Sequence, residues 1–263
     1  MGRKKYTAIA IPILLLIADA LHGENLPVLE PEVGPLFDFS PERIDRFNAP
    51  ELFAACDDVW QQMELEGRGS GEETEREKAI LELCDETKGS IWSTVGAGCS
   101  WYCGGLPQRI TASSALPNTA NNSYAAENAH DFSYETAWVE GVEGYGIGEF
   151  LTYEFPAVSP RITRIIVVNG YVKSEKIWRA NSRVKQLKVY KDDQPLALLN
   201  LKDIRADQSF SFDPIGHGDR ADHEKLQTMP AWTLRFEIVD VYKGAKYDDT
   251  VLSELYFDGI DVD

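Results

Sequence analysis

Residues 184–201, with the sequence VKQLKVYKDDQPLALLNL, contain two largely apolar segments separated by a short polar one. Polar and apolar side chains alternate from Gln186 to Val189, which is the two-residue period of a half-buried β-strand. Asp192, Asp193, Gln194 and Pro195 form a cluster typical of a turn. This stretch therefore predicts two strands joined by a turn, the second over residues 196–201.

The same period recurs on both sides of this stretch, from residue 107 to the C-terminus. Turn residues interrupt it at short intervals, and no helical pattern lies between the strands. The other predicted strands are residues 110–113, 149–155, 162–169, 209–212, 232–241 and 251–257. About eight short strands in succession favour a β-sandwich or jelly roll over a parallel sheet.

The region before the strands is different in character. Residues 21–39 are rich in Pro and Glu and have no apolar period, which predicts an extended tether. Residues 40–90 predict a small helical hairpin, because apolar side chains recur at helical spacing from Leu52 to Met63 and again from a second helix start near Glu72.

The first 20 residues have the features of a secretory signal peptide. Arg3, Lys4 and Lys5 precede the apolar residues 9–17, and Ala-Asp-Ala at 18–20 fits a cleavage site. The apolar run is shorter than the roughly 20 residues that a spanning helix needs. We therefore expect a secreted, periplasmic or cell-surface protein without a membrane span after signal cleavage.

Export affects the interpretation of the four cysteines, because thiols outside the cytosol are usually oxidised. Cys56, Cys84, Cys99 and Cys103 predict two disulfides, and three connectivities are possible. Cys56 and Cys84 fall on the apolar faces of the two predicted helices, so we prefer a Cys56–Cys84 staple across the hairpin and a Cys99–Cys103 loop. A zinc site would favour Cys-x-x-Cys spacing, which is absent.

The formal net charge of the chain is -17. A surface this acidic repels polyanions, so nucleic acids, sulfated glycans and anionic membranes are poor candidate partners.

Several motifs in the C-terminal two-thirds resemble discoidin-like domains. They are ASSAL at 112–116, YAAENAHDFSYETAW at 124–138, WVEGVEGYGIGE at 138–149, NGY at 169–171, NSRVK at 181–185 and DTVLSEL at 249–255. The resemblance is to coagulation-factor C modules and galactose-binding modules, and more closely to the bacterial translocation domain of NAD glycohydrolases. It implies a discoidin-like jelly-roll β-sandwich over residues 99–263, preceded by the disulfide-stapled hairpin.

The resemblance implies a structural Ca²⁺ between the first long loop and the last strand. Asp131 and Glu254 would supply carboxylates and Thr136 a hydroxyl and a carbonyl, and the main-chain carbonyls would come from Asn128, Ser133 and Ser253. Oxygen ligands with two negative charges suit Ca²⁺. This chain has Phe132 where a glycine commonly follows the aspartate. The alternative is that Asp131 and Thr136 form an Asx turn without metal.

The resemblance also implies glycan binding, which needs aromatic faces for sugar C–H groups and planar polar groups for hydroxyls. The candidates in the predicted loops are Glu140, Tyr145, Asn169, Tyr171, Lys173, Trp178, Asn181 and Arg183. Of these, Tyr145, Tyr171 and Trp178 are expected to be exposed, whereas Trp138 and the Trp101–Tyr102 loop are expected to pack.

No catalytic motif stands out: the sequence has no Gly-x-Ser-x-Gly, no His-Glu-x-x-His and no phosphate-binding glycine loop. We therefore expect a non-catalytic module that binds a glycan or a cell-surface receptor. The alternatives are a protein–protein interaction module and, less favoured, a glycosidase or NAD-cleaving enzyme.

Overall fold

The computed structural model describes residues 26–47, 50–83, 90–94 and 101–262. The predicted signal peptide lies outside these residues. The strands are β1 (Val28–Leu29), β2 (Glu32–Leu36), β3 (Arg109–Ala112), β4 (Trp138–Val139), β5 (Phe150–Phe155), β6 (Arg161–Asn169), β7 (Ser182–Lys191), β8 (Gln194–Asn200), β9 (Ala206–Ile215), β10 (Trp232–Tyr242) and β11 (Thr250–Ile260). The helices are α1 (Pro41–Phe47), α2 (Pro50–Leu65), α3 (Glu75–Leu83), α4 (Glu175–Ala180) and α5 (His223–Gln227), with single 3₁₀ turns η1 (Trp101–Cys103) and η2 (Ala126–Ala129).

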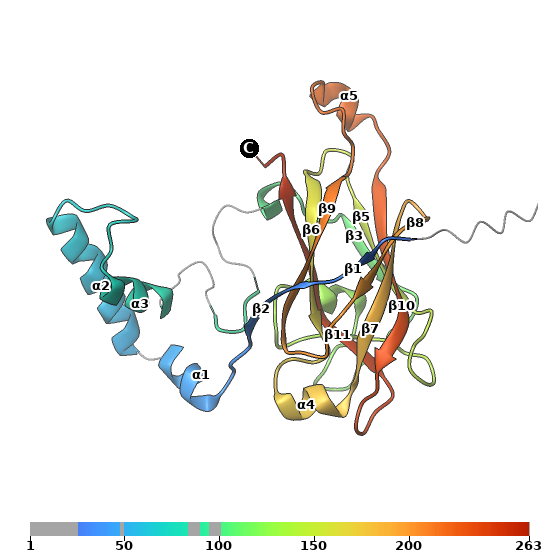
Figure 1. Cartoon of the computed structure of the whole chain (residues 1–263), viewed down its shortest axis with the longest axis horizontal. Coiled ribbons are helices and arrows are strands. Elements are labelled where there is room, and N and C mark those ends of the chain that lie inside the picture. Colours follow the sequence, from blue (N-terminus) through green and yellow to red (C-terminus); the bar gives the residue numbers. More distant parts are fainter. Residues whose placement is uncertain (1–25, 48–49, 84–89, 95–100, 263) are drawn as a thin grey trace, which may run out of the picture.

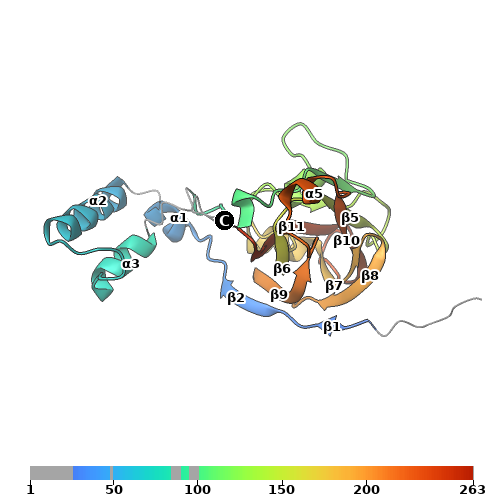
Figure 2. The ribbon, with the colours of Figure 1, turned by 90° about the horizontal axis from the view of Figure 1, so that it is seen from above.

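The strands wrap around one core as a β-sandwich (Figure 2). One layer has the order β3-β5-β10-β7-β8, and the other has the order β2-β9-β6-β11, with β4 paired to β11. The start of β11 pairs in parallel with β7 over two positions, where Thr250 lies opposite Ser182 and Val251 opposite Arg183. Because the pairing stops there, the two layers diverge from this corner and enclose the core.

All eight strands predicted from the two-residue period are present, which confirms the mainly β architecture. Asp192 and Asp193 join β7 to β8 with φ angles of 49° and 62°. Two successive positive φ angles are typical of the tight hairpin turns that match strand twist. The predicted turn is therefore confirmed at Asp192 and Asp193, whereas Gln194 and Pro195, which were expected in the turn, begin β8.

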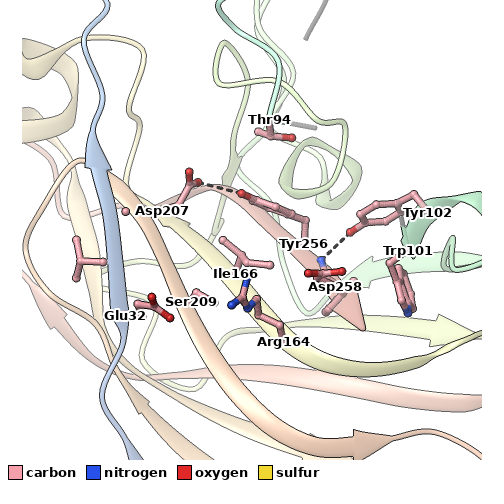
Figure 3. A pocket seen from close by; sticks show the side chains of 13 residues that line it. Glu32, Thr94, Trp101, Tyr102, Arg164, Ile166, Asp207, Ser209, Tyr256 and Asp258 are labelled. Carbon is pink, nitrogen blue, oxygen red and sulfur yellow. Dashed lines mark hydrogen bonds between the residues drawn. The ribbon is translucent and has the colours of Figure 1, made fainter. Parts of the chain in front are cut away.

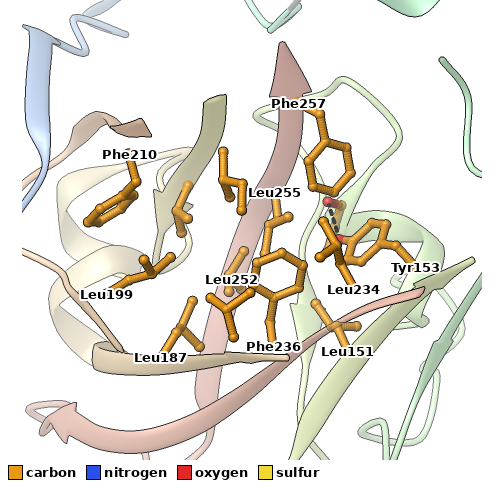
Figure 4. Close-up of a cluster of buried hydrophobic side chains, with 14 of the residues drawn as sticks. Leu151, Tyr153, Leu187, Leu199, Phe210, Leu234, Phe236, Leu252, Leu255 and Phe257 are labelled. Carbon is orange, nitrogen blue, oxygen red and sulfur yellow. Dashed lines mark hydrogen bonds between the residues drawn. The ribbon is translucent and has the colours of Figure 1, made fainter. Parts of the chain in front are cut away.

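Large apolar side chains from both layers fill the interior (Figure 4). Leu234, Phe236 and Ile238 alternate along β10 with half-exposed residues, as the period requires. Trp101 and Trp138 are each 1% exposed, so the predictions that they pack into the core are confirmed. The core thus fixes the strand ends from which the loops emerge.

The expectation of a free tether over residues 21–39 is wrong for its described part. Residues 28–29 pair in parallel with β8, and residues 32–36 pair antiparallel with β9 (Figure 1). We call residues 26–39 the N-terminal strap. It covers one edge strand of each layer, and unpaired edge strands are a recognised liability. Its pairing comes from backbone groups, so the side-chain pattern gives no sign of it.

The helical hairpin is present as α2 and α3, preceded by the unpredicted helix α1. Arg68, in the connection between α2 and α3, forms an ion pair with Glu77 of α3 at 2.7 Å. The hairpin lies to one side of the sandwich rather than over a sheet face (Figures 1 and 2). Cys56 is buried on α2, but Cys84 and Cys99 lie outside the described residues, so the two disulfide pairings stay predictions.

Two short helices interrupt the strands, contrary to the expectation of none. Ser174 caps α4 by accepting from the Ile177 N–H at 3.3 Å, and Asp222 caps α5 by accepting from the Lys225 N–H at 3.0 Å. These helices have six and five residues, which is too short to show a helical period. In the described part of the chain, none of the helices has the length and apolar character to cross a membrane.

Candidate functional site

Four of the eight predicted glycan-binding residues are buried, and three of them form one network where β6 and β7 meet α4. The Asn169 side chain donates to the Val184 carbonyl at 2.7 Å and accepts from the Val184 N–H at 2.8 Å. Trp178, only 5% exposed, donates its indole N–H to the Asn169 carbonyl at 2.9 Å. The prediction that Trp178 is exposed for stacking is therefore wrong.

Arg183 is the third member of this network. Its guanidinium lies 4.7 Å from the Trp178 ring centroid and makes a two-point ion pair with Asp203, at 3.0 and 2.9 Å. Gly170 has φ +78°, and an added Cβ would lie 2.4 Å from the Arg183 side chain. Only glycine fits there, so these residues hold the loops rather than face a ligand.

Glu140 is the fourth buried candidate, with no exposed surface. Its carboxylate accepts from the backbone N–H groups of Thr250 at 3.1 Å and Val142 at 2.9 Å. Burial raises the pKa of Glu140 above its ordinary value. Gly146 leaves no room for a side chain here, since an added Cβ would lie 2.4 Å from Glu140. Glu140 thus anchors the 141–149 loop to the start of β11.

The other four candidates, Tyr145, Tyr171, Lys173 and Asn181, are partly exposed. The Tyr145 carbonyl accepts from the Thr250 hydroxyl at 2.8 Å, and Lys243 Nζ lies 4.7 Å from the Tyr145 ring centroid. Tyr171 packs against a small apolar cluster that includes Val251. Both tyrosines therefore lie beside the start of β11, at one end of the sandwich.

The predicted calcium loop is connected to this end. The Tyr171 hydroxyl donates to the Glu135 carbonyl at 2.9 Å, and Lys173 forms an ion pair with the Glu135 side chain at 3.1 Å. Asn181 ends α4 by donating to the Ile177 carbonyl at 2.9 Å. Tyr171 and Lys173 thus adjoin the loop that carries Asp131 to Thr136.

Asp131 and Glu254 come together as predicted for a cation site. Glu254 has no exposed surface; one carboxylate oxygen accepts from the Ser133 N–H at 2.8 Å, and the other has no hydrogen-bond partner among the described residues. Burial and the adjacent Asp131 carboxylate raise the pKa of Glu254 well above its ordinary value. Two carboxyl groups in contact, one with an unsatisfied buried oxygen, fit a bound divalent cation.

The other predicted ligands surround this pair. The Thr136 hydroxyl lies 2.8 and 2.7 Å from the two Asp131 oxygens, and the Ser133 carbonyl accepts from the same hydroxyl at 3.3 Å. The Ser253 hydroxyl accepts from the Val172 N–H, and the Asn128 amide donates to the carbonyls of Ser123 and Ala137. The side chains of Ser253 and Asn128 therefore already have hydrogen-bond partners, so these two residues could offer a cation only their main-chain carbonyls.

The backbone of Phe132, which follows Asp131, has φ 61°. A left-handed conformation costs a non-glycine residue energy. The Phe132 ring lies 4.7 Å from Tyr102 and 5.0 Å from His130, so aromatic packing offsets this cost. Burial lowers the pKa of His130 to about 4, which leaves a neutral imidazole whose Nδ1 lies 2.8 Å from the Leu255 carbonyl.

A family model described as NAD glycohydrolase translocation F5/8 type C domain matches residues 101–258. No curated protein matches the chain.

Three solved structures illustrate what the chain is similar to. CpGH89CBM32-5 from Clostridium perfringens, in complex with GalNAc-β-1,3-galactose, is 15% identical with a TM-score of 0.40 over 59% of this chain and 99% of that one. The family 32 carbohydrate-binding module of Streptococcus pneumoniae EndoD is 8% identical with a TM-score of 0.41, and the match covers 59% of this chain and 98% of the EndoD module. The structure of the CBM32-1, CBM32-2 and M60 catalytic domains of Clostridium perfringens ZmpB is 14% identical to this chain with a TM-score of 0.41. That match covers 59% of this chain and only 14% of the ZmpB chain.

Proposed function

This chain belongs to the NAD glycohydrolase translocation F5/8 type C domain family, and from that membership we propose that it is an exported, non-catalytic module that binds cell-surface or extracellular glycan. The observation that carries the proposal is the pair of partly exposed tyrosines, Tyr145 and Tyr171, on loops at one end of a rigid sandwich. Lys173 and Asn181 add polar groups at the same end. Stacking rings with adjacent polar groups suit sugar recognition.

The buried candidates have a supporting role in this proposal. Glu140 anchors the Tyr145 loop, and the Asn169, Trp178 and Arg183 network holds the segment that carries Tyr171. A binding surface on loops needs such support, because side chains that are already ordered lose less entropy on binding.

Replacing Tyr171 or Tyr145 by alanine is expected to lower the affinity for a glycan identified on an array by about tenfold each, since an aromatic contact contributes about 0.5–1.5 kcal/mol beyond its buried area. The measurement is equilibrium titration with the full mature chain. Trp60→Ala, on α2 and 44% exposed, is the matched control and should bind like the unmodified protein.

Absence of detectable binding to any glycan on a broad array would contradict glycan binding. Recovery of a specific secreted or surface protein by the same chain, with loss of capture in the tyrosine variants, would then favour a protein–protein interaction module. Turnover of NAD or of a glycoside would overturn the non-catalytic assignment.

We also propose that Asp131, Glu254, Thr136 and neighbouring main-chain carbonyls hold a structural Ca²⁺. The support is the contact between two carboxyl groups and the unpartnered oxygen of Glu254. A bound cation would neutralise this pair and fix the 131–136 loop. Because Glu135 bonds Tyr171 and Lys173, the same cation would steady the proposed glycan surface.

Chelation is expected to lower the melting temperature of the protein by about 5–10 °C. A ligand at 100 times its dissociation constant adds about 2.7 kcal/mol, and each kcal/mol is worth roughly 2–4 °C at this size. The measurement is a thermal melt with excess Ca²⁺ or excess chelator. Glu254→Gln should abolish the difference, whereas Glu127→Gln, an exposed carboxylate on η2, should preserve it. An unchanged melting temperature at millimolar chelator would refute the calcium proposal.

Export and the two disulfides belong to the same proposal. They are supported by the signal-like residues 1–20 and by the buried position of Cys56 on α2. An exported module of this kind would attach its bearer to a surface outside the cell that makes it.

A further inference from the structure

A cavity of about 470 Å³ lies between the N-terminal strap and the outer face of the β9-β6-β11 layer (Figure 3). Its volume falls in the range of roughly 300–1,000 Å³ that is typical of small-molecule sites. It is separate from the loops that carry Tyr145 and Tyr171, because none of those residues lines it. No sequence motif pointed to it, since its walls come from segments far apart in the chain.

The floor of the cavity is a set of outward-facing side chains on neighbouring strands. Tyr256 and Asp258 alternate along β11 with the core residues Leu255 and Phe257. Pairing sets Ile166 of β6 opposite both Tyr256 and Ser209, and Arg164 of β6 opposite Asp258. The floor therefore combines an aromatic ring with charged and hydroxyl groups on rigid strands.

The walls come from the strap and from the 3₁₀ turn η1. Residues 32–34 of β2 form one side, and Trp101 and Tyr102 lie on the other. Tyr102 is held in place by its hydroxyl, which accepts from the Phe257 N–H at 2.7 Å. The cavity thus exists only when the strap is paired with β9.

The charged groups in the cavity are not paired with one another. The Arg164 guanidinium makes no hydrogen bond or ion pair with any residue in the described part of the chain, although Asp258 lies opposite Arg164 in the register. The carboxylates are those of Glu32, Asp207 and Asp258. Asp207 accepts from the hydroxyls of Tyr256 at 3.1 Å and Tyr134 at 3.4 Å, which fixes its position.

Two hydroxyls near the lining are closed to an occupant. Among the described residues, Ser209 Oγ and Thr94 Oγ1 make no hydrogen bond, but both oxygens are shielded from solvent. A group that water cannot reach is equally closed to a ligand. An occupant of the cavity would therefore meet the exposed side chains of Glu32, Arg164 and Asp258.

We propose that this cavity binds a neutral saccharide unit, as a second sugar subsite on the side of the sandwich. A sugar hydroxyl both donates and accepts, so it can use the guanidinium donors of Arg164 and the carboxylate acceptors of Glu32 and Asp258 together. An anion would meet three carboxylates against one arginine, so the lining disfavours an acidic sugar. The inference rests on the proposed glycan function and adds a site to it.

The test is saturation-transfer NMR on the full mature chain with two matched sets of probes: galactose, galactosamine and galacturonate, and glucose, glucosamine and glucuronate. The neutral sugars should bind more tightly than the two uronates. Arg164→Ala should weaken neutral sugar binding about tenfold or more, because it removes a charged donor. Ser209→Phe should block the cavity, and a thermal melt shows whether that variant folds.

Arg109→Ala, which removes an exposed arginine from β3 on the other layer, is the matched control and should leave binding unchanged. Loss of monosaccharide binding in Arg164→Ala, with retention in the Tyr145→Ala and Tyr171→Ala variants, supports the proposal. Retention in Arg164→Ala with loss in the tyrosine variants overturns it but leaves the glycan function standing. Equal or tighter binding of the uronates overturns the charge argument, and absence of binding by all six probes overturns the subsite.

Discussion

Replacing Trp178 by alanine is expected to destabilise the sandwich by about 3–5 kcal/mol, the usual cost of removing a buried tryptophan. The variant would lose the indole bond to the Asn169 carbonyl and the stacking of Arg183 on the ring. Asn169 joins β6 to β7 through Val184, so the loss would loosen the corner between the layers. Urea unfolding of the mature chain measures the change.

The adjacent residue supplies the control. Ile177 lies on the same helix, α4, but is 36% exposed, so Ile177→Ala should change stability by much less. If Trp178→Ala kept the unfolding midpoint of the unmodified protein and lost only glycan binding, the ring would be a ligand contact and its structural role would be refuted. Loss of binding together with lowered stability would instead reflect unfolding of the site.

Removing both phenylalanines of the N-terminal strap is expected to destabilise the protein by about 3 kcal/mol, because each is partly buried rather than fully so. Phe37 lies 4.6 Å from Tyr134, and Phe39 lies 4.5 Å from Trp92, centroid to centroid. This aromatic layer covers Val168, which has no exposed surface. The double variant Phe37→Ala/Phe39→Ala should unfold at lower urea and release the strap to proteases.

Leu36→Ala is the matched control, since Leu36 is in the same N-terminal strap but 67% exposed. It should leave both the unfolding midpoint and protease resistance almost unchanged. Equal sensitivity of the two variants would show that the strap is held by its backbone pairing with β8 and β9 alone. The double variant also bears on the side cavity, because β2 is one of its walls.

The strands were predictable because their signal is local. Strands such as β5 and β10 alternate buried and half-buried side chains, and burial on one face of a sheet imposes that period directly. The short helices α4 and α5 and the two strands of the strap gave no such signal. Helices of six and five residues complete too few turns, and the strap is exposed along much of its length.

The candidate site was predictable only in part. Asp131 and Glu254 are brought together as the family resemblance implied. Trp178 and Arg183 were expected in the loops as ligand contacts, yet they are buried against each other. Residue type in a loop indicates which contacts are possible, but not whether a ligand or the protein itself provides them.

The strand order along the chain, the hairpin turn at Asp192 and Asp193, and the family could be predicted from the sequence, because all three depend on short-range patterns. Three features follow only from the folded structure: which loop residues are buried, how the strap closes both layers, and where, among the described residues, the Arg164 guanidinium lies unpaired near Asp258. Those features depend on contacts between segments such as residues 32–34, 101–102 and 256–258, which only folding brings together. Such contacts leave no period in the sequence.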